Sequence, residues 1–123
     1  MLFKINFDSE TPIYMQIRNQ IIIGIGTGEL ASGEKLPTVR KMAADLGINM
    51  MTVNKAYGLL KSEGFIIADR RKGASVEVAV KPPDITAYRE KLTDDLKLVI
   101  SEAKLRGMSI LEFLALANVI WKK

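Results

Sequence analysis

Two short apolar repeats of helical period, each followed by a glycine, lie between Leu36 and Gly64. In the first repeat, apolar residues recur at i, i+3, i+4 and i+7, as on one face of an α-helix: Val39, Met42, Ala43 and Leu46. The second repeat has the same spacing: Val53, Ala56, Tyr57 and Leu60. Gly47 and Gly64 are expected to end the two helices, because glycine enters the left-handed region without steric penalty. Two amphipathic helices joined by a short turn predict a helix-turn-helix.

The second of these helices, expected to begin at Asn49 or Met50, carries few charges on the face opposite its apolar stripe. That face contains Met51, Asn54, Lys55, Gly58 and Ser62, flanked by Met50 and Thr52. An ordinary solvated face is usually richer in Glu and Lys, so this composition favours a surface that reads the major groove of DNA. Gly58 costs the helix about 1 kcal/mol relative to alanine. Either a close approach to another surface compensates this cost, or the glycine is a tolerated defect.

Positive charge is concentrated on the same segment. Residues 35–73 contain eight Lys and Arg against three Asp and Glu, a net +5, whereas the whole chain carries +4 and the remainder therefore −1. This distribution favours a phosphate-binding surface. The alternative is a chance cluster of charges on a solvated face.

Two apolar runs after Gly64, residues 65–68 and 75–80, predict β-strands. Between them lies a basic turn, Asp69-Arg70-Arg71-Lys72-Gly73. A hairpin with a cationic tip directly after a helix-turn-helix predicts a winged helix. Its tip is expected along the sugar–phosphate backbone or in the minor groove, where the potential favours positive side chains.

The segment before the motif is expected to hold one more helix. Phe3, Ile5 and Phe7 alternate, which predicts a short strand or an arm packed on the core. Thr11 followed by Pro12 predicts a capped helix start, and the apolar pattern continues to about Thr27. The glycines near that end have the spacing of neither a dinucleotide fingerprint nor a P-loop, so no phosphate cradle is expected.

Composition excludes several classes of chemistry. The chain has no cysteine and no histidine, which removes disulfides, Cys or His nucleophiles and the usual zinc ligands. The adjacent Asp94 and Asp95 do not face each other on a helix, so they make no catalytic pair. We therefore expect no enzyme, no catalytic residue, no metal and no cofactor. Without a signal peptide or an apolar run of ~20 residues, the protein is expected to be soluble and cytoplasmic, with no membrane partner.

Lys81-Pro82-Pro83 is expected to separate two domains, residues 1–80 and residues 81–123, since proline extends neither a central strand nor a helix interior. The second domain should hold two helices, divided by Gly107 and a capping box from Ser109 to Glu112. Its apolar residues are too many for one helix pair to bury, which favours association with a second copy. The alternative is that they cap the first domain. The expected dimerisation residues are Leu92, Leu96, Val99, Phe113, Leu114, Leu116, Ala117, Ile120 and Trp121.

The pattern from Leu36-Pro37-Thr38-Val39-Arg40 through Gly47, Thr52-Val53 and Gly64 to Lys72-Gly73 resembles the GntR family of bacterial transcription regulators. Thr11-Pro12-Ile13-Tyr14 is also similar to the family's first helix, and the short C-terminal region resembles its YtrA-like subfamily. The resemblance implies a winged helix-turn-helix, a homodimer and a repressor. In the large subfamilies a C-terminal domain binds a metabolite. Only about forty residues follow Pro83, which is too few for such a pocket, so no small-molecule effector is expected.

The resemblance also implies roles for individual residues. Thr38 and Arg40 match DNA contacts of the family's second helix, Asn49, Met50, Thr52 and Asn54 match recognition positions, and Lys72-Gly73 matches the wing tip. Met50 stands where the family often has arginine, and Arg71 where it often has glycine. Together with the exposed-face and charge arguments, the expected DNA-binding set is Thr38, Arg40, Asn49, Met50, Thr52, Asn54, Lys55, Arg70, Arg71, Lys72 and Gly73.

The expected fold is therefore mainly α with a small β-hairpin: a winged helix-turn-helix followed by a two-helix C-terminal dimerisation region. The function favoured by these observations is a sequence-specific, double-stranded-DNA-binding transcription regulator. It would act as a homodimeric repressor on a two-fold symmetric operator, through the helix that begins near Met50 and a basic wing. A second hypothesis is a winged-helix adaptor that docks protein. Arg40 and the basic turn favour the first hypothesis, because an adaptor needs neither.

Overall fold

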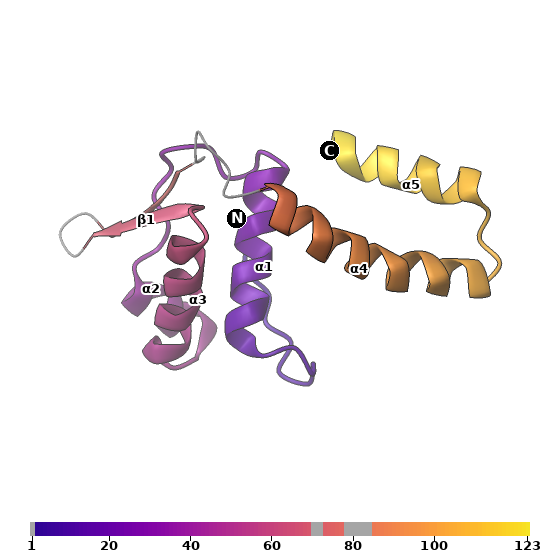
Figure 1. The fold of residues 1–123 in the computed structure, drawn as a ribbon. Coiled ribbons are helices and arrows are strands. Elements are labelled where there is room, and N and C mark those ends of the chain that lie inside the picture. The colour runs from indigo at the N-terminus through magenta and orange to yellow at the C-terminus, as the bar shows by residue number, and fades with distance from the viewer. Residues whose placement is uncertain (1, 70–72, 78–84) are drawn as a thin grey trace. The chain divides into compact units, whose positions relative to one another are not determined.

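A computed structural model describes residues 2–69, 73–77 and 85–123. The chain divides into two compact units, Met1–Lys81 and Pro82–Lys123. The first contains α1 (Ile13–Gly26), α2 (Val39–Leu46), α3 (Met50–Ser62), β1 (Ile66–Asp69) and β2 (Gly73–Val76) (Figure 1). The second contains α4 (Ile85–Leu105) and α5 (Ile110–Lys122). The expected fold class, mainly helical with a small hairpin, is confirmed. No helix among the described residues is long and apolar enough to cross a membrane.

Helices α1, α2 and α3 enclose one hydrophobic core with the hairpin. Its largest fully buried side chains are Ile17, Ile21, Met42, Val53, Leu60 and Val76. The stripes expected on α2 and α3 face this core, with Val39 and Leu46, at the two ends of α2, only half-buried. At the turn between the two helices, Gly47 has φ 67°. The N–H of Ile48 there bonds the carbonyl of Ala43 at 3.0 Å, so the left-handed glycine ends α2 as expected.

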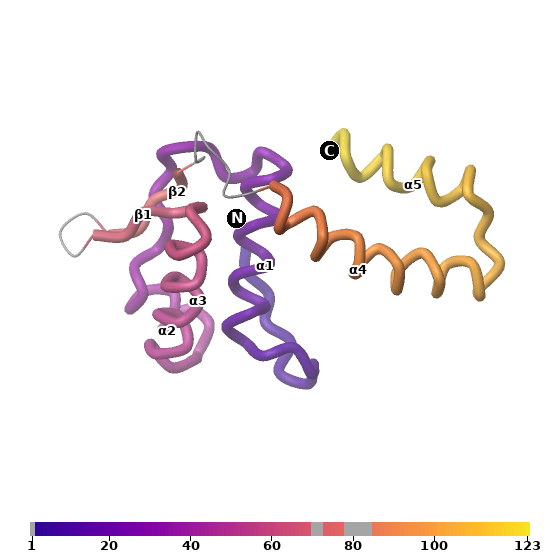
Figure 2. The backbone as a smooth tube through the Cα atoms, viewed as in Figure 1, coloured from indigo at the N-terminus to yellow at the C-terminus, as the bar shows by residue number. Residues whose placement is uncertain are grey.

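Strand β2 has a backbone neighbour on each side, β1 on one and a segment of the α1–α2 loop on the other. Strands β1 and β2 form a hairpin (Figure 2). They are antiparallel, with Ile66 opposite Val76. On its other side β2 bridges to Lys35, and the N–H of Leu36 bonds the carbonyl of Ala74 at 2.9 Å. Strand β1 is displaced by one residue from the expected 65–68, and β2 begins two residues earlier than expected and ends at Val76. The expected strand over residues 78–80 lies outside the described residues.

The N-terminal arm is held by two glutamines of α1. The Gln20 side chain donates to and accepts from the backbone of Lys4, at 2.6 and 3.0 Å, and the Gln16 side chain bonds Asn6 in the same way, at 2.9 and 2.8 Å. The arm is not a strand, because these side chains take the hydrogen bonds that a neighbouring strand would take. Phe3 and Ile5 pack on the core, whereas Phe7 is exposed.

The expected cap at Thr11 is wrong. Pro12 is the N-cap residue of α1, and no side chain caps the helix. The carbonyl of Pro12 already accepts the first helical N–H groups, from Met15 at 3.0 Å and Gln16 at 3.1 Å. The Thr11 carbonyl accepts instead from the Gln16 side-chain amide, at 2.9 Å.

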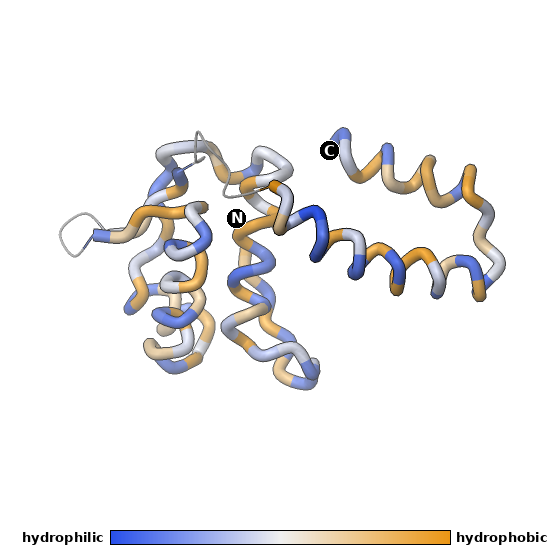
Figure 3. Tube along the Cα trace, viewed as in Figure 1, coloured by the Kyte–Doolittle hydropathy of each residue, from blue (hydrophilic) through white to orange (hydrophobic). Residues whose placement is uncertain are grey.

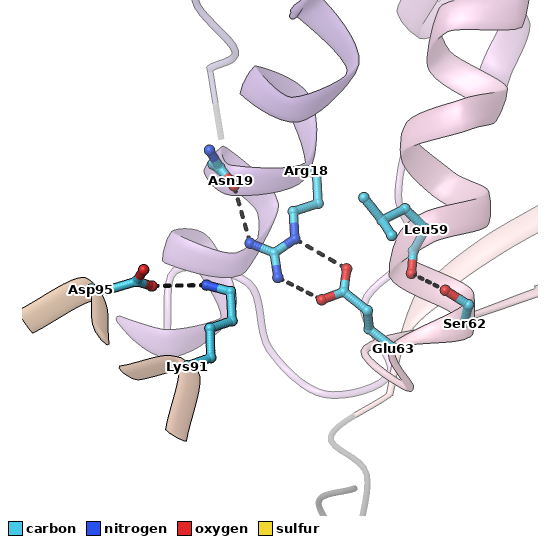
Figure 4. Close-up of polar contacts among 7 residues, drawn as sticks. All are labelled: Arg18, Asn19, Leu59, Ser62, Glu63, Lys91 and Asp95. Carbon is cyan, nitrogen blue, oxygen red and sulfur yellow. Dashed lines mark hydrogen bonds and ion pairs between the residues drawn. The ribbon is translucent and has the colours of Figure 1, made fainter. Parts of the chain in front are cut away.

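An ion pair fixes α1 against the end of α3. The Arg18 guanidinium donates to both carboxylate oxygens of Glu63, from Nη2 at 2.5 Å and from Nε at 3.1 Å (Figure 4). Both side chains are about three-quarters buried. A bidentate geometry of this kind restricts rotation as well as separation of the two helices.

In the second unit, no residue of α4 or α5 is buried, and both helices are described along their full length. The expected capping box opens α5: the Ser109 hydroxyl accepts the Glu112 N–H at 3.2 Å, and the Glu112 carboxylate accepts the Ser109 N–H at 3.1 Å. These two bonds lower the pKa of Glu112. Figure 3 shows apolar residues along the length of both helices. Since the pair leaves them exposed, the single chain does not complete a core in this unit.

Candidate nucleic-acid interface

The exposed face of α3 is organised by Asn49 at its start and by Lys55 in its middle. Asn49 is the N-cap residue, and its side-chain oxygen accepts the Met51 N–H at 2.7 Å. Met50, Met51, Asn54, Lys55, Gly58 and Ser62 are exposed, and Thr52 is half-buried. Lys55 lies over the ring of Tyr14 on α1, with Nζ 4.1 Å from the ring centroid. This cation–π contact directs Lys55 to the α1 side of the face.

The start of α2 lies next to this face. The Thr38 hydroxyl caps α2 by accepting the Lys41 N–H at 3.1 Å. The N–H groups of Val39 and Arg40, in the first turn, have no carbonyl partner within the helix and lie at the positive end of its dipole. Arg40 is exposed, whereas the Lys41 ammonium pairs with Asp45 at 3.2 Å. The arrangement can accept a phosphate at the helix terminus, with Arg40 beside it.

A buried tyrosine joins the two helices at this point. The Tyr57 hydroxyl donates to the carbonyl of Pro37 at 2.6 Å and lies 3.9 Å from the sulfur of Met42. Burial raises the pKa of Tyr57, so the hydroxyl remains protonated at neutral pH. Tyr57 therefore holds the residue before Thr38 against α3.

An open groove of about 460 Å³ lies between the start of α2, the exposed face of α3 and the hairpin. Thr38, Asn54 and Gly73 line it, which brings together residues from the three parts of the expected DNA-binding set. Gly73 has φ 73° and begins β2. Arg70, Arg71 and Lys72 lie outside the described residues.

Sequence reasoning does not identify Tyr57 and Lys61 as groove residues, although both line the groove. The spacing of Tyr57 assigns it to the core stripe, and its hydroxyl partner is twenty positions away in sequence. Lys61 enters the sequence argument only as a charge. A signal for it is present, because Lys61 follows Gly58 by three positions and Asn54 by seven, which puts it on the same helical face.

The residues expected to mediate dimerisation all lie on α4 and α5. Phe113 is half-buried, and the others are exposed: Leu92, Leu96, Val99, Leu114, Leu116, Ala117, Ile120 and Trp121. An apolar pocket of about 450 Å³ lies where the two helices meet, lined in part by Ile100 and Phe113.

The model of the family described as "Bacterial regulatory proteins, gntR family" matches residues 13–76, from the start of α1 to the end of β2. The chain belongs to the gntR family. It is therefore a DNA-binding transcription regulator with a winged helix-turn-helix, and its relatives are regulators rather than enzymes.

Two curated relatives of the helix-turn-helix type match almost the whole chain. The uncharacterized regulator YhcF of Bacillus subtilis is 33% identical over 109 residues, covering 88% of each protein. The repressor YtrA of the same organism is 32% identical over 109 residues, covering 89% of this chain and 84% of YtrA. The expected similarity to the YtrA-like group is confirmed.

Three solved structures have a similar fold. A protein described as a transcriptional antiterminator from Listeria monocytogenes superimposes with a TM-score of 0.83 at 30% identity, covering 98% of this chain and 93% of that one. YtrA of Sulfolobus acidocaldarius, described as a GntR-family transcription factor, superimposes with a TM-score of 0.67 at 40% identity, covering 82% of this chain and 99% of that one. The DNA-binding domain of AraR, solved with operator ORE1, superimposes with a TM-score of 0.52 at 25% identity, covering 62% of this chain and 93% of that one.

Proposed function

We propose that this gntR-family protein is a homodimeric, sequence-specific repressor that binds a two-fold symmetric operator. Each protomer would insert the exposed face of α3 in the major groove and lay the basic turn between β1 and β2 on the DNA backbone. The groove lined by Thr38, Asn54 and Gly73 carries this proposal, because it joins the start of α2, the exposed face of α3 and the hairpin on one surface.

The side chains on this surface suit separate tasks in DNA binding. The Asn54 amide offers a donor and an acceptor and can pair with adenine in the major groove. The α2 N-terminus, Arg40 and Lys61 supply positive charge for phosphates or, for Arg40, a guanine edge. Arg70, Arg71 and Lys72 add three charges between the two strands. Together they provide both the base contacts that give specificity and the phosphate contacts that give affinity.

The exposed apolar residues of α4 and α5 support dimerisation. Trp121 is 89% exposed, Leu111 77% and Leu98 72%. Burying a large apolar side chain contributes roughly 1.5–3 kcal/mol, and monomers rarely expose apolar patches of this extent. A second copy would cover these side chains. Two-fold pairing would also present two copies of α3 to the two half-sites of an operator.

Repression in the cytoplasm is proposed from the similarity to the Bacillus subtilis repressor YtrA, which extends over most of both chains. An operator-bound dimer can block access of other proteins to the same DNA. The dimer would act without a small-molecule effector.

The test is selection of bound fragments from random duplex DNA by the full-length protein, followed by titration of the enriched sequence. We expect a two-fold symmetric consensus, nanomolar affinity and a steep loss of affinity with salt, because phosphate contacts release counterions. The same protein should sediment as a dimer. If a folded protein enriches no sequence above background, the proposal is wrong, and a protein-docking role for the α3 face replaces it.

A further inference from the structure

The first turn of α3 exposes two methionine side chains. Met51 is 75% exposed and Met50 is 43% exposed. Asn54 and Gly58 follow Met51 at i+3 and i+7, so helix geometry aligns Met51 with both on the exposed face of α3. An apolar side chain there must meet an apolar feature of whatever α3 binds, or remain in water.

Two polar groups close to the methionines in sequence make contacts within the protein. The Asn49 side-chain oxygen accepts the Met51 N–H at 2.7 Å, and the Lys55 ammonium lies 4.1 Å from the centroid of the Tyr14 ring. The first two residues of α3 therefore present two thioether chains outward. Methionine donates no hydrogen bond and is only a weak acceptor, so it cannot read the donor and acceptor pattern of a base edge.

The major groove has one apolar feature that depends on sequence, the 5-methyl group of thymine. The N-terminal residues of a recognition helix are those that contact base edges in helix-turn-helix proteins. Met51 and Met50 occupy those positions in α3. Methionine is also flexible and polarizable, which suits contact with a small methyl group at the floor of a groove.

We propose that Met51, with Met50 beside it, reads thymine 5-methyl groups, so that the operator carries thymine where the start of α3 meets each half-site. The inference rests on the proposed binding of DNA through α3 and assigns the base class that this part of the helix selects. Met51 is the principal reader because it is more exposed and lies in line with Asn54.

The experiment compares the duplex selected from random DNA with duplexes in which each thymine in turn is replaced by uracil. Uracil keeps the hydrogen-bonding edge of thymine and lacks only the methyl group. We expect about fourfold weaker binding at one or two positions per half-site, which is the change for losing burial of one methyl group. In Met51→Ala the ratio of thymine to uracil affinities at that position should fall from about four to about one, and Met51→Leu should retain most of it.

Ile23→Ala is the matched control, because Ile23 is an apolar side chain of α1 that is 62% exposed and lies outside the exposed α3 face. Its thymine-to-uracil ratio should equal that of the parent. Three results would overturn the inference and leave the proposed function standing. The first is tight binding without an effect of uracil at any position, and the second is a consensus without thymine. The third is a thymine-to-uracil affinity ratio that is unchanged in both Met51→Ala and Met50→Ala. Failure to bind any duplex would overturn both.

Discussion

The hydroxyl of Tyr57, in the middle of α3, donates a 2.6 Å hydrogen bond to the backbone carbonyl of Pro37, immediately before the α2 cap residue Thr38. This bond connects α3 to the start of α2. It sets the position of the α2 N-terminus relative to the exposed face of α3, and the proposed function requires both on one DNA surface.

Tyr57→Phe should lower the free energy of unfolding by about 1–2 kcal/mol, because it leaves the Pro37 carbonyl without its partner in a partly buried place. DNA affinity should fall as well, since the start of α2 is less well held. Urea unfolding and DNA titration measure the two effects. Tyr88→Phe, on an exposed residue of α4, is the control and should change neither.

The same residue predicts a dependence of stability on pH. Burial raises the pKa of Tyr57 in the folded state, so its stabilising effect is complete below the unfolded pKa of about 10 and is lost as pH rises above it. The unfolding free energy of the parent should therefore fall more steeply between pH 9 and 11 (roughly the tyrosine range) than that of Tyr57→Phe. Equal slopes would contradict this assignment.

Gly58→Ala should affect stability and DNA binding in opposite directions. A Cβ added at Gly58 meets no atom of the protein within 4 Å, so alanine should stabilise α3 by about 1 kcal/mol. The same methyl group would separate α3 from DNA and weaken binding. Gly26→Ala, which also has no neighbour within 4 Å, should leave DNA affinity unchanged. Unchanged DNA binding in Gly58→Ala would mean that this glycine is only tolerated.

Arg40→Ala should weaken binding to the selected operator by about 1–3 kcal/mol and relax base preference at one position per half-site, as removal of a bidentate guanine interaction does. Lys97→Ala, which removes one charge from the second unit, is the control. Equal weakening on all sequences would assign Arg40 to a phosphate instead. No weakening would remove it from the interface.

Replacing Arg70, Arg71 and Lys72 together by alanine should weaken specific and non-specific DNA binding alike. The slope of log affinity against log salt should decrease by about 1 for each phosphate that is no longer neutralised. Circular dichroism should be unchanged. An unaltered salt slope would show that these charges do not touch DNA.

Leu114→Glu should convert the proposed dimer to a monomer, because it places a charge among the exposed apolar residues of α5. Ser101→Glu introduces the same charge on the exposed polar face of α4 that carries Asp94 and Lys97, and should remain dimeric. Sedimentation equilibrium at tens of micromolar (roughly the range in which a weak dimer dissociates) distinguishes them. Operator affinity should fall by orders of magnitude in the monomer, since the second half-site is no longer held at high effective concentration. A parent protein that sediments as a monomer would contradict the proposed dimer.

Interactions between residues that are close in sequence were predictable. The Thr38 cap of α2, the left-handed Gly47 and the capping box between Ser109 and Glu112 each depend on groups within a few positions of one another. The apolar stripes of α2 and α3 were predictable for the same reason, because helical period alone decides which residues share a face. These features determined the winged helix-turn-helix and most of the expected DNA-binding face.

Tertiary structure alone decided which distant residues meet. Arg18 pairs with Glu63 across 45 positions, Tyr57 reaches back to Pro37, and Lys35 bridges to Ser75 on the free side of β2. No local pattern encodes such pairs, because a side chain has many possible partners until the core fixes the backbone around it. Sequence by itself determined the helices and their exposed faces, while packing in three dimensions decided how the start of α2, Asn54 and Gly73 come to share one groove.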